Sequence, residues 1–146
     1  MFDQCETLFQ KTELFQHHGI MISYLDESQR SKCTAGTILQ RCMMKVEAFR
    51  MNMNRCLCVF KIGMTTNPLL RFHFYAKGNY SHMSLLHVTN NIGVAQMLEA
   101  ALIQSHMAEK QCRNEKLGGD GPPTNQDGRH FVYIVGARAD VFKRIF

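Results

Sequence analysis

The sequence lacks any apolar run as long as the roughly 18 to 20 residues that a helix needs to cross a bilayer. Its first residues also lack a basic stretch followed by an apolar run, which is the pattern of a secretory signal. We therefore expect no membrane partner and an intracellular location, in the cytoplasm or the nucleus.

Zinc-site motifs are missing too, since the chain has no CxxC pair and no CxxC combined with HxxxH. Its 6 cysteines could in principle pair, but 45% hydrophobic residues can form a core without disulfides. We expect reduced and mostly buried thiols.

Internal repeats and low-complexity tracts are absent, and 146 residues suit one main domain with an ordinary core. The net charge of +5 fits a protein that binds nucleic acid, an acidic partner or an anionic surface. It fits a solvated basic surface equally well, so charge alone does not choose a function. The sequence gives no indication of an oligomeric state.

Two strands are expected after a helical beginning. Apolar residues recur at helical spacing over residues 2–17. Residues 42–50 alternate loosely between apolar and polar side chains, which predicts a half-buried strand. A turn over residues 52–55 would join this strand in a hairpin to a β-rich strand over residues 56–63.

Helix signals are clearest around Pro68. Asn67 is a candidate N-cap, Pro68 suits the first helical position and Gly78 is a stop, so residues 69–77 are predicted to be a short helix. The later elements are a strand over 84–88, a helix over 93–109 capped by Asn90 or Asn91, a glycine loop over 113–127, a strand over 130–135 and a short final helix.

This order of elements predicts an α/β fold with a small central antiparallel β-sheet flanked by helices. We expect the sheet domain to occupy residues 42–146 and a helical extension to occupy residues 1–41.

Several segments of the chain form one pattern: Lys61-Ile62-Gly63 followed by Arg71, the helix around Glu99, and the asparagine-and-glycine block from Asn114 to Gly121. Together these segments resemble the GIY-YIG nuclease superfamily. The match covers about residues 43–121, just over half of the chain. The first piece is closest to the branch of the family in which lysine replaces the tyrosine before Ile-Gly.

The resemblance implies hydrolysis of phosphodiester bonds with one divalent metal ion, Mg²⁺ or Mn²⁺. Glu99 would hold the metal, Arg71 would bind the scissile phosphate, and Asn114 would lie at the edge of the same site. Magnesium needs only one or two protein carboxylates, so a single glutamate is chemically sufficient. The planar guanidinium of Arg71 suits a phosphate.

Simpler interpretations of the same residues stay open. Arg71 and Glu99 could form an internal ion pair between two helices, and Asn114 could serve only to turn the backbone.

The first tyrosine signature of the family is missing, because residues 47–50 contain no tyrosine at the expected distance ahead of Lys61. Lys61 replaces the second tyrosine and is expected to contact phosphate, or else to act as a base. Tyr75 lies one helical turn after Arg71 and could supply the missing hydroxyl, although packing is the commoner use of such a residue. His73 is a weaker candidate base, because it lies on another face of the helix.

Lys77, Arg113 and Lys116 flank the expected site and could bind backbone phosphates, or could simply be solvated. We expect a metal-dependent endonuclease that acts on nucleic acid, DNA rather than RNA. The alternatives are a degenerate domain of this type that binds nucleic acid without cleaving it, and a structural interaction domain.

Overall fold

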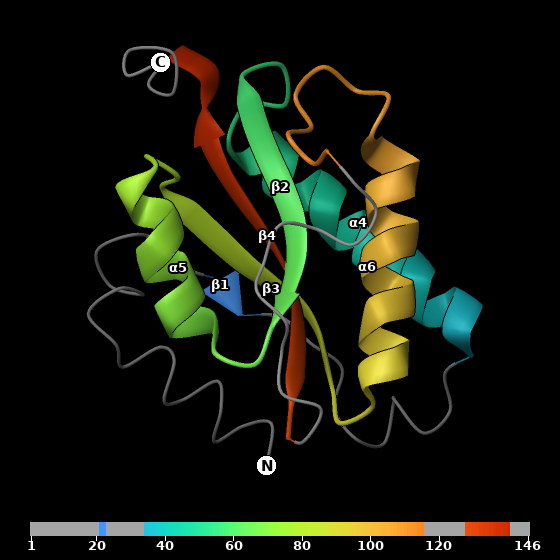
Figure 1. Cartoon of the computed structure of the whole chain (residues 1–146). Helices are drawn as coiled ribbons and strands as arrows, with labels where there is room; N and C mark the ends of the chain where they lie inside the picture. The colour runs from blue at the N-terminus through green and yellow to red at the C-terminus, as the bar shows by residue number, and fades with distance from the viewer. Residues whose placement is uncertain (1–20, 23–33, 116–127, 141–146) are drawn as a thin grey trace.

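A computed structural model describes residues 21–22, 34–115 and 128–140 of the chain (Figure 1). The fold is α/β, as predicted, with a small antiparallel sheet at its centre. The strands stand in the order β1-β3-β4-β2. They are β1 (Met21–Ile22), β2 (Cys58–Thr65), β3 (His82–Thr89) and β4 (His130–Arg138), of which β2, β3 and β4 are antiparallel and β1 runs parallel to β3.

Helices cover both faces of this sheet. Figure 1 shows α5 (Pro68–Lys77) on one side and α4 (Ala35–Asn52) and α6 (Ile92–His106) on the other. The alternation of side chains along β4 explains the two layers, because Tyr133 packs towards α5 and Ile134 packs towards α4 and α6. The expected arrangement of a central sheet flanked by helices is therefore confirmed.

The strand predicted over residues 42–50 is wrong, because these residues lie within α4. Three buried side chains, Cys42, Val46 and Phe49, recur at helical spacing and face the sheet. The loose alternation of the same segment comes from side chains on the exposed face of the helix, such as Met44. The expected domain boundary between residues 41 and 42 falls inside this helix.

The predicted hairpin is consequently wrong as well, and β2 finds its partner at the far end of the described chain. β2 pairs antiparallel with β4 along its whole length, from Cys58 opposite Arg138 to Thr65 opposite Phe131. In this register Gly63 lies opposite Tyr133. β4 is thus the central strand, with β2 on one side and β3 on the other.

The predicted helices around Pro68 and after Asn91 agree closely with the structure. Asn67 caps α5 by accepting a hydrogen bond from the Leu70 N–H at 3.1 Å, and Gly78 ends this helix. Asn91, one of the two candidates, caps α6 by accepting from the Val94 N–H at 3.2 Å. These contacts satisfy backbone donors that no helical carbonyl can reach.

The outer edge of β2 is covered by the segment that follows α6. The Phe60 N–H donates to the Gln111 carbonyl at 2.9 Å, and the Arg113 N–H donates to the Phe60 carbonyl at 2.8 Å. Phe60 and Cys112 form a parallel bridge between the two segments. An unpaired strand edge invites association, so this cover completes the sheet locally and places residues 113–115 beside β2.

Four cysteines fall in the described ranges, and all are free thiols: Cys42, Cys56, Cys58 and Cys112. Burial raises the pKa of Cys42 and of Cys58 to about 11, which keeps both thiols protonated and unreactive at neutral pH. Cys56 is exposed.

No helix in the described ranges combines the length and the hydrophobicity needed to span a membrane. The helix expected over residues 2–17, most of the glycine loop and the short helix expected at the end of the sequence lie outside the described residues.

Candidate functional site

Three side chains meet on the α5 face of the sheet. The Tyr75 and Tyr133 hydroxyl oxygens are 3.0 Å apart and share a hydrogen bond. The Arg71 guanidinium donates to the Tyr133 hydroxyl at 3.4 Å. Both tyrosines are buried and Arg71 is half-buried, so the group joins a cation to two phenols at the edge of the core.

The positions of these residues follow from local structure. Arg71 and Tyr75 are four residues apart on α5 and therefore project from the same face of the helix. Tyr133 rises from the central strand β4 to meet them. Gly63 leaves room for its ring, because a Cβ at that position would lie 2.6 Å from the Tyr133 Cζ.

Burial raises the pKa of Tyr133 well above its ordinary value of 10.0, and the neighbouring Tyr75 adds to this effect. The Arg71 charge and its hydrogen bond oppose this rise. Tyr133 therefore stays a neutral phenol near neutral pH, and it can donate a hydrogen bond as well as accept one.

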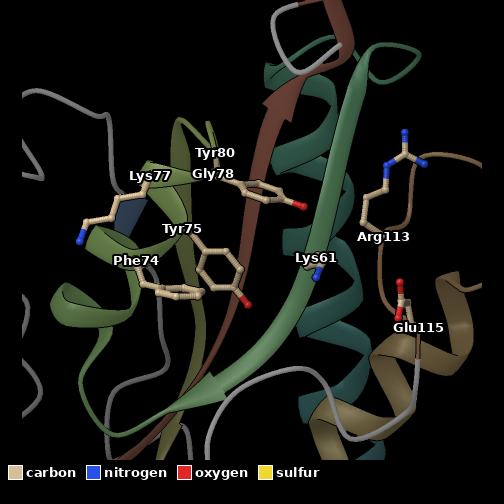
Figure 2. A pocket seen from close by; sticks show the side chains of 8 residues that line it. All are labelled: Lys61, Phe74, Tyr75, Lys77, Gly78, Tyr80, Arg113 and Glu115. Atoms are coloured by element: carbon tan, nitrogen blue, oxygen red, sulfur yellow. The ribbon is translucent and has the colours of Figure 1, made fainter. Parts of the chain in front are cut away.

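A cavity of about 510 Å³ opens beside this group. Figure 2 shows aromatic side chains from α5 and the segment after it on one side, Lys61 of β2 in the middle, and Arg113 and Glu115 on the other side. The aromatic wall consists of Phe74, Tyr75 and Tyr80, with Lys77 and Gly78 beside it. Among the described residues, three cationic side chains and one carboxylate thus line a space of the size that small ligands occupy.

Asn114 has a structural contact of its own. Its Oδ1 accepts from the Ile62 N–H at 2.9 Å, and its Nδ2 donates to the Ile62 carbonyl at 2.9 Å. The side chain thereby continues the pairing of the β2 edge and fixes residues 113–115 against Lys61. Asn114 is 8% exposed and positions the wall of the cavity.

Glu99 lies on α6 and is 5% exposed. Its neighbours on the helix, Leu98 and Leu102, pack in the core layer between α4, α6 and the sheet. α5 and α6 cover opposite faces of the sheet, so Arg71 and Glu99 approach β2 from different sides. The second carboxylate to consider is Glu115, which the sequence did not single out and which lines the cavity itself.

The donor set limits which metal ion could fit. In the described part of the chain no three histidine, cysteine, aspartate or glutamate side chains gather into a metal-binding group. A transition metal held mainly by the protein has no ligand set there. Magnesium fits better, because it accepts one carboxylate and takes its other ligands from water and phosphate. Glu99 and Glu115 both provide that kind of oxygen ligand.

The structure brings together several of the residues that the sequence singled out. Lys61, Tyr75, Lys77 and Arg113 line one cavity, and Arg71 joins it through Tyr133. His73 is exposed on α5 and is absent from the cavity wall. Lys116 lies outside the described residues.

Tyr133, like Glu115, is a residue that sequence reasoning missed. The strand over residues 130–135 was expected, but its tyrosine was not connected with the signature around Lys61. The β-branched and aromatic residues over 131–135 predict a strand, but they do not indicate which strand it pairs with. Only the pairing itself, across some sixty residues of intervening chain, assigns Tyr133 to the site.

Comparison with known proteins gives no relative: no family model, no curated protein and no solved structure matches this chain.

Proposed function

We propose that this protein is a metal-dependent endonuclease of the GIY-YIG type that hydrolyses phosphodiester bonds in nucleic acid, with DNA as the favoured substrate. The observation that carries the proposal is the convergence of Arg71, Tyr75 and Tyr133 beside the cationic cavity. A guanidinium and two phenols can together surround the oxygens of a phosphodiester with hydrogen-bond donors.

The partner of β2 supports the resemblance to the GIY-YIG family. In that family a strand with the first tyrosine signature precedes the second signature strand, but the strand that the sequence predicted ahead of Lys61-Ile62-Gly63 contains no tyrosine. β4 pairs with those residues and carries Tyr133 opposite Gly63, although it follows them in the chain. We infer that β4 takes the place of the missing first signature strand, with the order of the segments permuted.

Each side chain has a role in this proposal. Arg71 binds the scissile phosphate through its planar guanidinium, and Tyr133 donates a hydrogen bond to a phosphate oxygen or orients the attacking water. Lys61 offsets the charge of the adjoining phosphate from the floor of the cavity. Mg²⁺ or Mn²⁺, when bound, would lower the pKa of a water molecule and neutralise charge on the leaving group. Glu115, which lines the cavity itself, is the proposed ligand for the metal. Glu99, the ligand that the resemblance implied, is the alternative, although its helix covers the opposite face of the sheet.

One observation favours a second function, binding of nucleic acid without cleavage. Because burial raises the pKa of Tyr133, the side chain is a neutral phenol near neutral pH, and it has no phenolate form to take the proton of the attacking water. A phenol that stays neutral can still bind a phosphate, so a degenerate binding domain would retain the same contacts.

Cleavage of labelled single-stranded, double-stranded and branched DNA and RNA, with Mg²⁺, with Mn²⁺ and with chelator, separates the two functions. We expect metal-dependent cutting that falls about 100-fold or more in Arg71→Ala, and about 100-fold in Tyr133→Phe. Glu99→Gln and Glu115→Gln, compared side by side, identify the metal ligand. Only the variant that lacks the ligand should lose the metal-dependent cutting.

A matched control is Arg138→Ala, which removes a half-exposed arginine whose ion pair with Asp140 spans 3.4 Å on the surface. This variant should cut as the natural sequence does. If the protein binds nucleic acid but cuts none of the substrates in the presence of metal, the nuclease proposal is wrong and the binding domain is the better account. Equal loss of cutting in Arg138→Ala and Arg71→Ala would show that general charge, and not the site, is responsible.

A further inference from the structure

An exposed aromatic ring stands at the rim of the cavity. Phe74 is 69% exposed on α5, although the buried face of the same helix carries Phe72 and Tyr75. A lone exposed phenylalanine is unremarkable in itself. This one lines the cavity and lies edge-on to Tyr75, with ring centroids 5.9 Å apart and an interplanar angle of 74°.

The charges around that ring fit an anionic ligand. Lys77 and Arg113 are exposed at opposite sides of the cavity, and Lys61 is half-buried between them. Among the described residues that line the cavity, Glu115 is the one carboxylate. An apolar ring bordered by separated cations matches a flat base with a phosphate on either side of it.

A base inside a continuous duplex has both faces covered by its neighbours, so it cannot lie against a protein ring. A base in a single strand, a flap or an opened junction exposes its faces, and stacking on an aromatic side chain is then tolerant of sequence. The shape of the substrate therefore decides whether the Phe74 ring can be used.

We propose that the cavity holds an unstacked nucleotide next to the scissile phosphate, with its base stacked on Phe74 and its flanking phosphates bound by Lys77 and Arg113. The inference rests on the proposed nuclease function and makes it more specific: the substrate is a single-stranded segment or a junction rather than continuous duplex. The rings of Tyr75 and Tyr80 are in contact, and both buried side chains line the inner part of the cavity.

The test measures binding in the presence of chelator, so that cleavage plays no part. The probes are a fluorescein-labelled single-stranded DNA, the same strand annealed to its complement, and the same strand with one abasic position. We expect the natural sequence to bind the single strand more tightly than the duplex. Phe74→Ala should weaken single-strand binding by about 5- to 150-fold, the range for loss of one stacked base, and leave duplex binding unchanged.

Phe74→Trp preserves stacking and should retain tight binding, which separates loss of the ring from general damage to α5. Met51→Ala is the matched control, since Met51 is also 69% exposed but lies on α4, across the sheet from the cavity. For the probe whose abasic site coincides with the stacked position, Phe74→Ala should have little further effect.

Unchanged single-strand binding in Phe74→Ala would overturn the stacking proposal, whether or not the protein cuts. So would equal weakening with single strand and duplex. If the ring stacks a base in chelator but the protein shows no metal-dependent cutting, the stacking site stands and only the proposed cleavage is wrong.

Discussion

At the scale of single residues, the site depends on Tyr133 and on the absence of a side chain at Gly63. The tyrosine ring crosses from the central strand towards α5, and its hydroxyl meets Tyr75 at 3.0 Å. The ring can follow this path because Gly63, directly opposite in the ladder, contributes no Cβ. One missing methyl group thus determines whether the phenol reaches the guanidinium of Arg71.

Gly63→Ala should destabilise the protein by about 1 to 3 kcal/mol. The new methyl group would lie 2.6 Å from the Tyr133 Cζ, and the buried ring is surrounded by other core side chains. Urea denaturation measures the free energy of unfolding. Gly36→Ala is the control, since its Cβ on α4 meets nothing closer than 4.0 Å and should be neutral or slightly stabilising. Equal stability of the two variants would contradict the close approach of Gly63 and Tyr133.

The titration of Tyr133 gives a second prediction at this scale. Because burial raises its pKa above 10.0, the folded protein keeps the proton while the unfolded chain releases it. The stability that Tyr133 contributes is therefore complete below about pH 10 and is lost as the pH rises further. Absorbance of phenolate should show one tyrosine ionising late in the natural sequence and missing from Tyr133→Phe. A Tyr133 that titrates near the ordinary value of 10.0 would contradict its burial.

At the scale of elements, the helix termini and the strand segments differ in how far the sequence predicts them. The caps of α5 and α6 are local, since Asn67 and Asn91 each contact a backbone N–H three residues ahead, and the sequence identified both helices. α4 was misread because an amphipathic helix and a loosely alternating strand share apolar positions over nine residues. The pairing of β2 with β4 has no local signal at all.

The cap of α5 should matter for function as well as for stability. Asn67→Ala removes the acceptor for the Leu70 N–H and should lower the free energy of unfolding by about 1 kcal/mol, as should Asn91→Ala on α6. Fraying of the first turn of α5 would also loosen Arg71, whose N–H bonds to the Asn67 carbonyl at 3.1 Å.

Asn67→Asp keeps a side-chain acceptor at the cap and serves as the rescue variant. It should restore both stability and single-strand binding. Binding that falls in Asn67→Ala and stays low in Asn67→Asp would show that the amide itself, rather than the cap, is needed.

At the scale of the whole molecule, a charged network holds α4, α6 and the cover of β2 together. Arg50 of α4 is 2% exposed and pairs with Glu109, beyond α6, and with Glu47 at 3.4 Å. Its guanidinium lies over the Phe60 ring, 4.7 Å from the centroid. Arg55 joins both glutamates from the surface, at 3.3 Å to Glu47 and 3.6 Å to Glu109.

Glu109→Gln should lower the free energy of unfolding by about 2 kcal/mol, because Arg50 would remain buried with only one carboxylate. Arg55→Ala should cost less than about 1 kcal/mol, since Arg55 is 53% exposed and its ion pairs are screened by water. Thermal unfolding of both variants gives the comparison. The reverse order would mean that surface charge, and not the buried arginine, dominates this network.

The sequence predicted the class of fold and most of its helices, but it predicted only part of the candidate site. Lys61, Arg71 and Tyr75 were identified through the resemblance to the family signature, whose residues lie close together in the chain. Tyr133 and Glu115 belong to distant segments that reach the cavity through strand pairing and through the Asn114 contact with Ile62. Long-range contacts of this kind leave little trace in local composition.

The central position of β4 also has a consequence for the growing chain on the ribosome. β2 and β3 emerge first, yet both pair with β4. At about 5 to 20 residues per second, the chain between Thr65 and His130 takes several seconds to synthesise. During that interval the hydrophobic strands have no partner between them, and Arg71 has no tyrosine hydroxyl from β4 to meet. The nascent protein is therefore exposed to aggregation until its central strand is released, and a truncated product would lack a complete site.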